Sequence, residues 1–124
     1  METRRIGIIL NGVTGRMGTN QHLFRSIVAI MKQGGVRVSP ELTLMPDPIL
    51  TGRNENKLKP LAERAGKELG TAPLKYTTDL QKALDDASYE VFFDASGTLQ
   101  RARFIEMAVK AKKAIYCEKP TATE

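Results

Sequence analysis

A strand-like run that ends in three evenly spaced glycines constrains this chain more than any other feature. The segment IGIILNGVTGRMG places Gly12, Gly15 and Gly18 directly after an apolar stretch. The first glycine permits a tight turn, the second lets a phosphate approach the backbone, and the third lets the following helix pack closely on the strand. The free N–H groups at the start of that helix favour an anion. The turn is therefore predicted to bind the pyrophosphate of a dinucleotide, through Gly12, Thr14, Gly15, Arg16 and Met17.

Beyond this turn, strand-like runs alternate with helix-like periods, which predicts a parallel sheet covered by helices on both faces. Right-handed crossovers between the strands give the order 3-2-1-4-5. The sequence therefore predicts an α/β domain with a Rossmann doubly wound, mostly parallel sheet, and a ligand crevice at the carboxyl ends of the first and fourth strands. The expected strands are residues 5–10, 48–51, 74–76, 89–95 and 114–117.

The first two expected helices end at glycines. The first follows Gly18 and stops at Gly34 and Gly35, after which residues 36–44 alternate around a Ser-Pro turn and predict a hairpin-like insertion. The second helix has its apolar stripe within residues 58–65, and the glycines that can end it are Gly66 and Gly70.

Two further helices complete the alternation. Thr78 and Gln81 have the spacing of a capping box at the start of the third helix. Helical spacing of apolar residues predicts the inner face of the third helix, namely Leu80, Ala83, Leu84 and Ala87, and a fourth helix that carries Phe104, Ile105, Ala108 and Val109.

Composition indicates an ordinary globular protein. The 124 residues make about one domain, so we expect residues 1–124 to be a dinucleotide-binding domain that needs a second, C-terminal domain to hold a small-molecule substrate. No apolar run is long enough to cross a membrane, and the basic residues behind the net charge of +5 are scattered, so neither a membrane nor a nucleic acid is an expected partner. The single cysteine and the lack of a leader-like pattern after METRR favour the cytoplasm.

The residues after the second expected strand bear on the choice of cofactor. A cofactor with a free ribose 2′-hydroxyl calls for Asp or Glu there, whereas the chain reads Gly52-Arg53-Asn54. A guanidinium can bind a 2′-phosphate through paired hydrogen bonds and can stack on adenine. Arg53 therefore favours NADP, with NAD as the alternative, and Asn54 and Lys57 are candidates for further contacts with the same phosphate.

Several further residues are examined as candidates for the site because of their chemistry or their position after a strand. Ser96, Gly97 and Thr98 form a small-residue loop after the fourth strand that suits a nicotinamide ribose, although Ser96 or Thr98 also fits a helix N-cap. Asp94, inside an apolar strand, is expected to have a structural hydrogen-bond partner. His22 and Cys117 are not expected to be catalytic, and no metal site is expected.

At the end of the fifth expected strand stands Glu118-Lys119-Pro120. Together with the glycine-rich first turn about a hundred residues earlier, this motif resembles the N-terminal domain of the glucose-fructose oxidoreductase/inositol dehydrogenase (Gfo/Idh/MocA) superfamily. The resemblance covers essentially the whole chain. It implies that Lys119 lies near the nicotinamide and substrate, as the catalytic residue, and that Glu118 lies beside the cofactor ribose.

The same resemblance implies an activity. It predicts hydride transfer between the nicotinamide and a hydroxyl-bearing carbon of a sugar-like or polyol substrate, in a protein that is a homo-oligomer at full length. The loop Ser96-Gly97-Thr98-Leu99 departs from the Thr-Pro pattern with a following His that is frequent in the family. Two alternatives stay open: a reductase similar to dihydrodipicolinate reductase, suggested by GVTGRMG, and a Rossmann module that senses NADP without turnover.

Overall fold

The computed structural model describes residues 2–12, 26–94 and 98–117, with the backbone alone for 98–101, 116 and 117. Its sheet has strands in the order β2-β3-β1-β5-β6, with β4 also paired to β3. All pairings are parallel except that of β2 with β3. The strands are β1 (Glu2–Asn11), β2 (Val36–Ser39), β3 (Leu42–Thr51), β4 (Lys75–Thr77), β5 (Tyr89–Asp94) and β6 (Ala114–Cys117). The five parallel strands thus follow the order β4-β3-β1-β5-β6, which confirms the predicted 3-2-1-4-5 arrangement.

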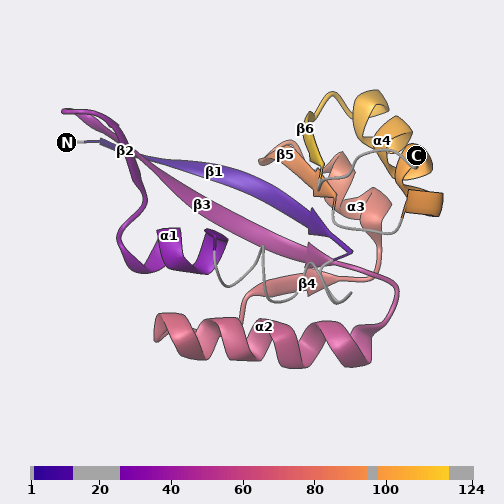
Figure 1. Cartoon of the computed structure of the whole chain (residues 1–124), viewed down its shortest axis with the longest axis horizontal. Helices are drawn as coiled ribbons and strands as arrows, with labels where there is room; N and C mark the ends of the chain where they lie inside the picture. Colours follow the sequence, from indigo (N-terminus) through magenta and orange to yellow (C-terminus); the bar gives the residue numbers. More distant parts are fainter. Residues whose placement is uncertain (1, 13–25, 95–97, 118–124) are drawn as a thin grey trace.

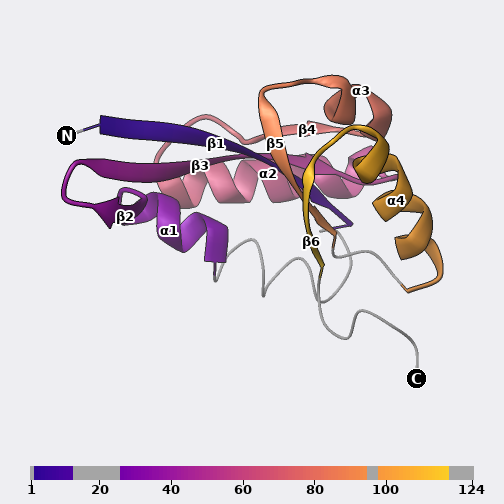
Figure 2. The same ribbon diagram turned by 90° about the horizontal axis from the view of Figure 1, so that it is seen from above.

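Four helices flank this sheet, namely α1 (Ala29–Lys32), α2 (Glu55–Leu69), α3 (Leu80–Asp85) and α4 (Thr98–Lys110). Figure 1 shows α1 and α2 together along one side of β1 and β3, with α3 and α4 grouped beside β5 and β6. Viewed from above, β1 and β3 run side by side along the length of the molecule (Figure 2). None of the helices in the described ranges is long and apolar enough to cross a membrane.

The second expected strand is longer than predicted. Residues 36–39 and 42–44 do form the expected hairpin, but its second arm continues without a break into β3, which pairs with β1 from Leu42 to Thr51. On its other edge, β3 pairs with β2 up to Leu44 and with β4 from Ile49. Pro46 and Pro48 lie between these two segments, where this edge of β3 has no partner among the described strands and needs no N–H donors. Both prolines therefore fit inside the strand.

The cap of α3 is one residue away from the predicted position. Asp79, rather than Thr78, is the N-cap residue, and its carboxylate accepts a hydrogen bond from the backbone N–H of Lys82 at 3.1 Å. The hydroxyl oxygen of Thr77 accepts from the N–H of Asp79 at 3.0 Å, which fixes the turn before the helix. Because α3 ends at Asp85, Ala83 and Leu84 are buried but Ala87 is exposed.

Two apolar clusters lie on opposite faces of the sheet. The first contains Leu10, Val28, Leu50, Leu58, Leu61, Ala62 and Ala65, contributed by β1, β3, α2 and the segment before α1. The second contains Ile9, Ala83, Leu84, Tyr89, Phe92 and Ala108, from β1, α3, β5 and α4. Phe104 and Met107 of α4 also pack against the second cluster, whereas Val109 of the same helix is 58% exposed.

Glycines terminate the helices of the first face as predicted. Gly70 ends α2 with a left-handed φ of +72°, which settles the choice between Gly66 and Gly70. Gly34 and Gly35, with φ of +97° and +101°, follow α1. Gly12, at the end of β1, has a φ of +78° and donates its N–H to the carbonyl of Thr51 at 3.0 Å. The chain therefore begins the predicted glycine turn in a backbone conformation that favours glycine.

Candidate functional site

A cavity of about 410 Å³ opens at the carboxyl ends of β1 and β3, on the face that carries α3 and α4. Its walls come from the end of β1 and the loop after β3 (Asn11, Gly52, Arg53), the start of α3 (Thr78, Asp79, Leu80, Gln81) and one face of α4 (Arg103, Phe104, Met107). This volume is typical of sites that hold small molecules and cofactors. The cavity lies at the edge of the sheet where an open parallel sheet binds its ligand.

Three polar side chains tie the strand ends together beneath this cavity. Asn11 donates through its Nδ2 to Asp94 Oδ1 at 3.1 Å and accepts through its Oδ1 from the Thr51 hydroxyl at 2.9 Å. Asn11 is the register partner of both Thr51 and Asp94. All three residues are buried, so each hydrogen bond satisfies a group that burial would otherwise penalise. The expected structural partner of Asp94 is thus Asn11.

The network also fixes the orientation of Asn11. A carboxylate accepts hydrogen bonds but cannot donate them, so the NH₂ group of Asn11 faces Asp94 and its carbonyl oxygen faces Thr51. Gly12 follows at once and begins the glycine turn. The residue just before that turn is therefore held from both neighbouring strands, β3 and β5.

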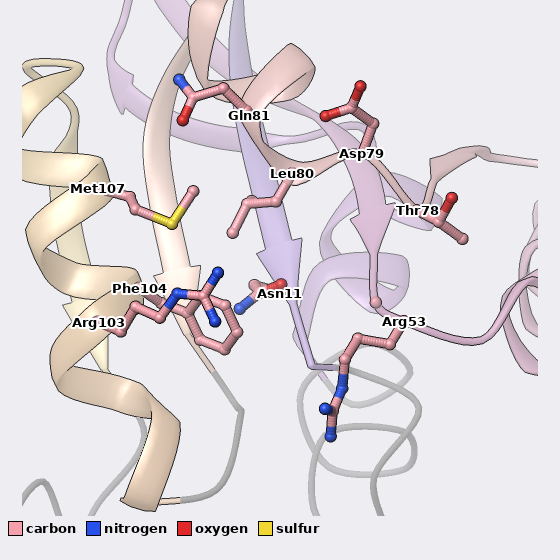
Figure 3. Close-up of a pocket in the computed structure, with 10 residues that line it drawn as sticks. Asn11, Arg53, Thr78, Asp79, Leu80, Gln81, Arg103, Phe104 and Met107 are labelled. Carbon is pink, nitrogen blue, oxygen red and sulfur yellow. The ribbon is translucent and has the colours of Figure 1, made fainter.

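Two arginines stand on different walls of the cavity. Arg53 comes from the loop after β3 and Arg103 from α4, and both are exposed. No ion pair joins either guanidinium to a carboxylate within the described ranges. In Figure 3, Arg103 extends from α4 toward Asn11, while the guanidinium of Arg53 points away from the start of α3. Asp79 supplies the one carboxylate among the described residues of the wall, and this carboxylate caps α3. The cavity thus offers two cations and an apolar wall to an anionic or aromatic ligand.

Comparisons with known proteins bear on this arrangement. No protein-family model matches the chain. A D-xylose dehydrogenase from Paenarthrobacter nicotinovorans is 40% identical over 121 residues, which cover 98% of this chain and 30% of that protein. Levoglucosan dehydrogenase in complex with NADH and levoglucosan matches with a TM-score of 0.66 and 26% identity, over 96% of this chain and 29% of that one. An NAD binding oxidoreductase from Klebsiella pneumoniae matches with a TM-score of 0.64 and 28% identity, over 95% and 28%.

The chain fits the N-terminal nucleotide-binding domain of the Gfo/Idh/MocA superfamily. These matches confirm the family that the glycine turn and the Glu-Lys-Pro motif predicted, and the Rossmann-like α/β fold with them. The chain spans less than a third of the length of each of these three proteins. They carry the names of dehydrogenases and oxidoreductases, and the levoglucosan dehydrogenase structure contains NADH.

The structure brings only part of the predicted Gfo/Idh/MocA site together. Arg53 lines the cavity as expected. Asn54 caps α2, where its side-chain oxygen accepts from the N–H of Asn56 at 2.9 Å, and Lys57 lies exposed in the first turn of that helix. Thr98 is the first residue of α4. The remaining predicted residues, namely Thr14, Gly15, Arg16, Met17, Ser96, Gly97, Glu118 and Lys119, lie outside the described residues.

Sequence reasoning missed most of the cavity wall. Asn11 and Thr51 stand at the ends of apolar runs, and no motif marks them as site residues. The sequence predicts a capping box from Thr78 and Gln81 and apolar helix positions at Leu80 and Phe104, but no place in the site for any of these four. One signal was available, because Thr78 and Asp79 directly follow β4 and chemistry is expected at strand ends of this sheet type. No comparable signal pointed to Arg103, which lies within a helix.

Proposed function

We propose that this chain is the cofactor-binding domain of an NADP-dependent dehydrogenase that acts on a sugar or a related polyol. The Gfo/Idh/MocA family supports the nicotinamide cofactor and the redox chemistry. The names of the relatives, D-xylose dehydrogenase and levoglucosan dehydrogenase, support a carbohydrate substrate. A second domain after residue 124, in an enzyme that is a homo-oligomer in the cytoplasm, belongs to the same proposal.

The cavity fits the adenosine half of such a cofactor. Gly12 begins a turn with backbone geometry that suits glycine, at the end of the central strand where the pyrophosphate passes in a Rossmann domain. The space beside it is bounded by the end of β3, which faces the adenosine ribose in this fold, and by apolar side chains of α3 and α4. The nicotinamide supplies the hydride chemistry when the cofactor is bound.

The residues of the chain bind and orient the reactants. The Thr51–Asn11–Asp94 network holds the strand ends from which the phosphate-binding turn starts. Lys119 is assigned to the substrate side of the nicotinamide, where an ammonium would polarise the reacting oxygen and stabilise the negative charge that develops on it. Glu118 is assigned to the cofactor ribose.

The observation that carries the choice of NADP is Arg53. It lies at the end of β3 with an exposed guanidinium on the rim of the cavity, at the place where NAD-binding domains carry a carboxylate. A 2′-phosphate would receive charge-assisted hydrogen bonds from this group, whereas a free hydroxyl would gain little. The side-chain oxygen of Asn54 is used in the cap of α2 and its NH₂ group carries no charge, so Arg53 is the principal phosphate ligand in this proposal.

We expect the intact protein to bind NADPH about 10-fold more tightly than NADH, a difference of about 1.4 kcal/mol. Arg53→Ala should remove this preference by weakening NADPH, with NADH affinity changed less than about 3-fold. Calorimetric titration of both cofactors measures the ratio. Arg37→Ala is the matched control, because it removes an equal charge from β2, outside the cavity. Equal affinities in the wild-type protein, or an unchanged ratio in Arg53→Ala, would contradict the choice of NADP.

A further inference from the structure

The cavity contains a second cation that neither the sequence motifs nor the family match assigns to a role. Arg103 is exposed, lies on the cavity wall and extends toward Asn11. Its guanidinium forms no ion pair with the described residues, so it is available to a ligand in the cavity. Two groups of a dinucleotide could bind a guanidinium there, namely a phosphate, as proposed for Arg53, or the aromatic adenine base.

The position of Arg103 on α4 decides where its side chain can act. Residues four apart lie on the same face of a helix, so Arg103 shares a face with Met107. Met107 and the neighbouring Phe104 both line the cavity and pack against the second apolar cluster. Among the described side chains, Arg103 thus lies on the same side of α4 as Met107, next to an apolar part of the cavity wall.

The wall around Arg103 suits an aromatic ring better than a phosphate. Leu80 from α3 faces Phe104 and Met107 from α4, and these three side chains give the cavity its apolar part. A phosphate placed among these apolar side chains would lose much of its hydration and gain only one cationic partner, Arg103. A purine would gain apolar contact on its faces, and a guanidinium can stack over a ring while its edges stay hydrated. Arg53, on a different wall at the end of β3, is the better placed phosphate ligand.

We propose that Arg103 stacks on the adenine base of the cofactor and holds it against the wall formed by Leu80, Phe104 and Met107. This inference rests on the proposed function, because it requires a dinucleotide in this cavity. It assigns the two arginines different tasks: Arg53 distinguishes NADP from NAD, whereas Arg103 contributes equally to both, since both carry adenine.

Titrations of NADPH, NADH and AMP with the intact protein test the inference. Arg103→Gln should weaken all three ligands by about 5-fold and leave the NADPH-to-NADH ratio unchanged. Arg103→Lys should behave in the same way, because lysine keeps the charge but lacks the planar group. Lys110→Gln is the control, since it removes a charge from the far end of α4, where Lys110 pairs at the surface with Glu106. Thermal melting confirms that the variants fold, as expected for an exposed residue.

Several results would overturn the proposal. If Arg103→Gln weakens the binding of NADPH alone, Arg103 is a phosphate ligand. If Arg103→Lys keeps the wild-type affinities, the charge of the residue matters and its planar group does not. Wild-type affinities in Arg103→Gln would remove the residue from the site. If the wild-type protein does not prefer NADPH, the choice of NADP fails while the NADH and AMP titrations still decide the role of Arg103. If it binds no dinucleotide, both proposals fail.

Discussion

A single amide side chain, that of Asn11, connects three strands of the central sheet. It satisfies the carboxylate of Asp94 with its NH₂ group and the hydroxyl of Thr51 with its oxygen. Neither a carboxylate nor an apolar group can fill both roles. The residue before Gly12 is thus specified by its two neighbours, which explains a buried polar residue directly after the apolar run of residues 6–10.

Asn11→Asp should destabilise the protein strongly at neutral pH, because the donor to Asp94 becomes a second buried carboxylate. Leaving a buried polar group unsatisfied costs about 1–3 kcal/mol, and the repulsion of two negative charges adds to this. Repulsion raises the pKa of the carboxyl pair in the folded variant above its value in the unfolded chain. The variant should therefore regain free energy of unfolding relative to wild type as the pH falls from 7 to 5, and lose it as the pH rises.

Denaturant unfolding at both pH values measures this effect. Thr51→Val is the control, because it removes a hydrogen bond from the same network without adding a charge. Its cost should be about 1 kcal/mol and independent of pH in this range. A deficit in Asn11→Asp that does not change between pH 7 and pH 5 would contradict the account of Asn11.

At the scale of the elements, the turn between α3 and β5 is built around one carboxylate. Asp86 accepts hydrogen bonds from the Ser88 hydroxyl at 2.7 Å and from the Ser88 backbone N–H at 2.9 Å. These bonds, in that order, hold the pKa of Asp86 below its ordinary value, and the nearby charges of Lys113 and Arg5 act in the same direction. The turn thus favours the ionised carboxylate.

Ser88→Ala should raise the pKa of Asp86 part of the way toward its ordinary value, because the stronger of the two hydrogen-bond contributions is lost while the backbone donor stays. A lowered pKa means that Asp86 stabilises the fold above the pKa of the unfolded chain, and that this contribution disappears as the pH falls through the lower folded value. The variant should therefore lose less stability on acidification than wild type. NMR titration of the Asp86 carboxyl measures the shift, and Ser39→Ala, in the β2–β3 hairpin, is the control. An unchanged pKa in Ser88→Ala would refute the assignment to the hydroxyl.

The elements also show where sequence patterns are sufficient. The strand order could be predicted from the alternation of elements and the handedness of crossovers, and the end of the first helix from Gly34. The end of the second helix was left open between Gly66 and Gly70, and the structure selects Gly70. The length of β3 could not be predicted in this way. Its two prolines are tolerated inside the strand because neither β2 nor β4 pairs with β3 at those positions, and this depends on the tertiary arrangement. The apolar residues of α4 predicted a helix but not its buried face, because they occupy two adjacent stripes; packing buries Ala108 with Met107 beside it and leaves Val109 exposed.

At the scale of the whole molecule, the sheet separates two apolar clusters, and the cavity belongs to one side only. Its wall combines residues near positions 11, 53, 79 and 103, which come together because the strand order places β1 and β3 beside each other and sets α3 and α4 on one face. The positive φ of Gly12 agrees with the start of the glycine turn, which consecutive residues predict. The opposite wall could not be predicted, since no pattern within α4 distinguishes a cavity-facing arginine from a solvated one.

The apolar wall of the cavity is also the rim of the second cluster, because Leu80, Phe104 and Met107 are only partly buried there. A ligand seated on them removes apolar surface from water, so binding should carry a negative change in heat capacity. Calorimetry of NADPH binding at several temperatures should show this sign, and Leu80→Ser should make the change smaller. A heat-capacity change near zero in the wild-type protein would place the bound ligand off this wall. A ligand bound in the cavity would thus bury the exposed edge of the second apolar cluster, so binding should extend the hydrophobic core on that face of the sheet and leave the first cluster unchanged.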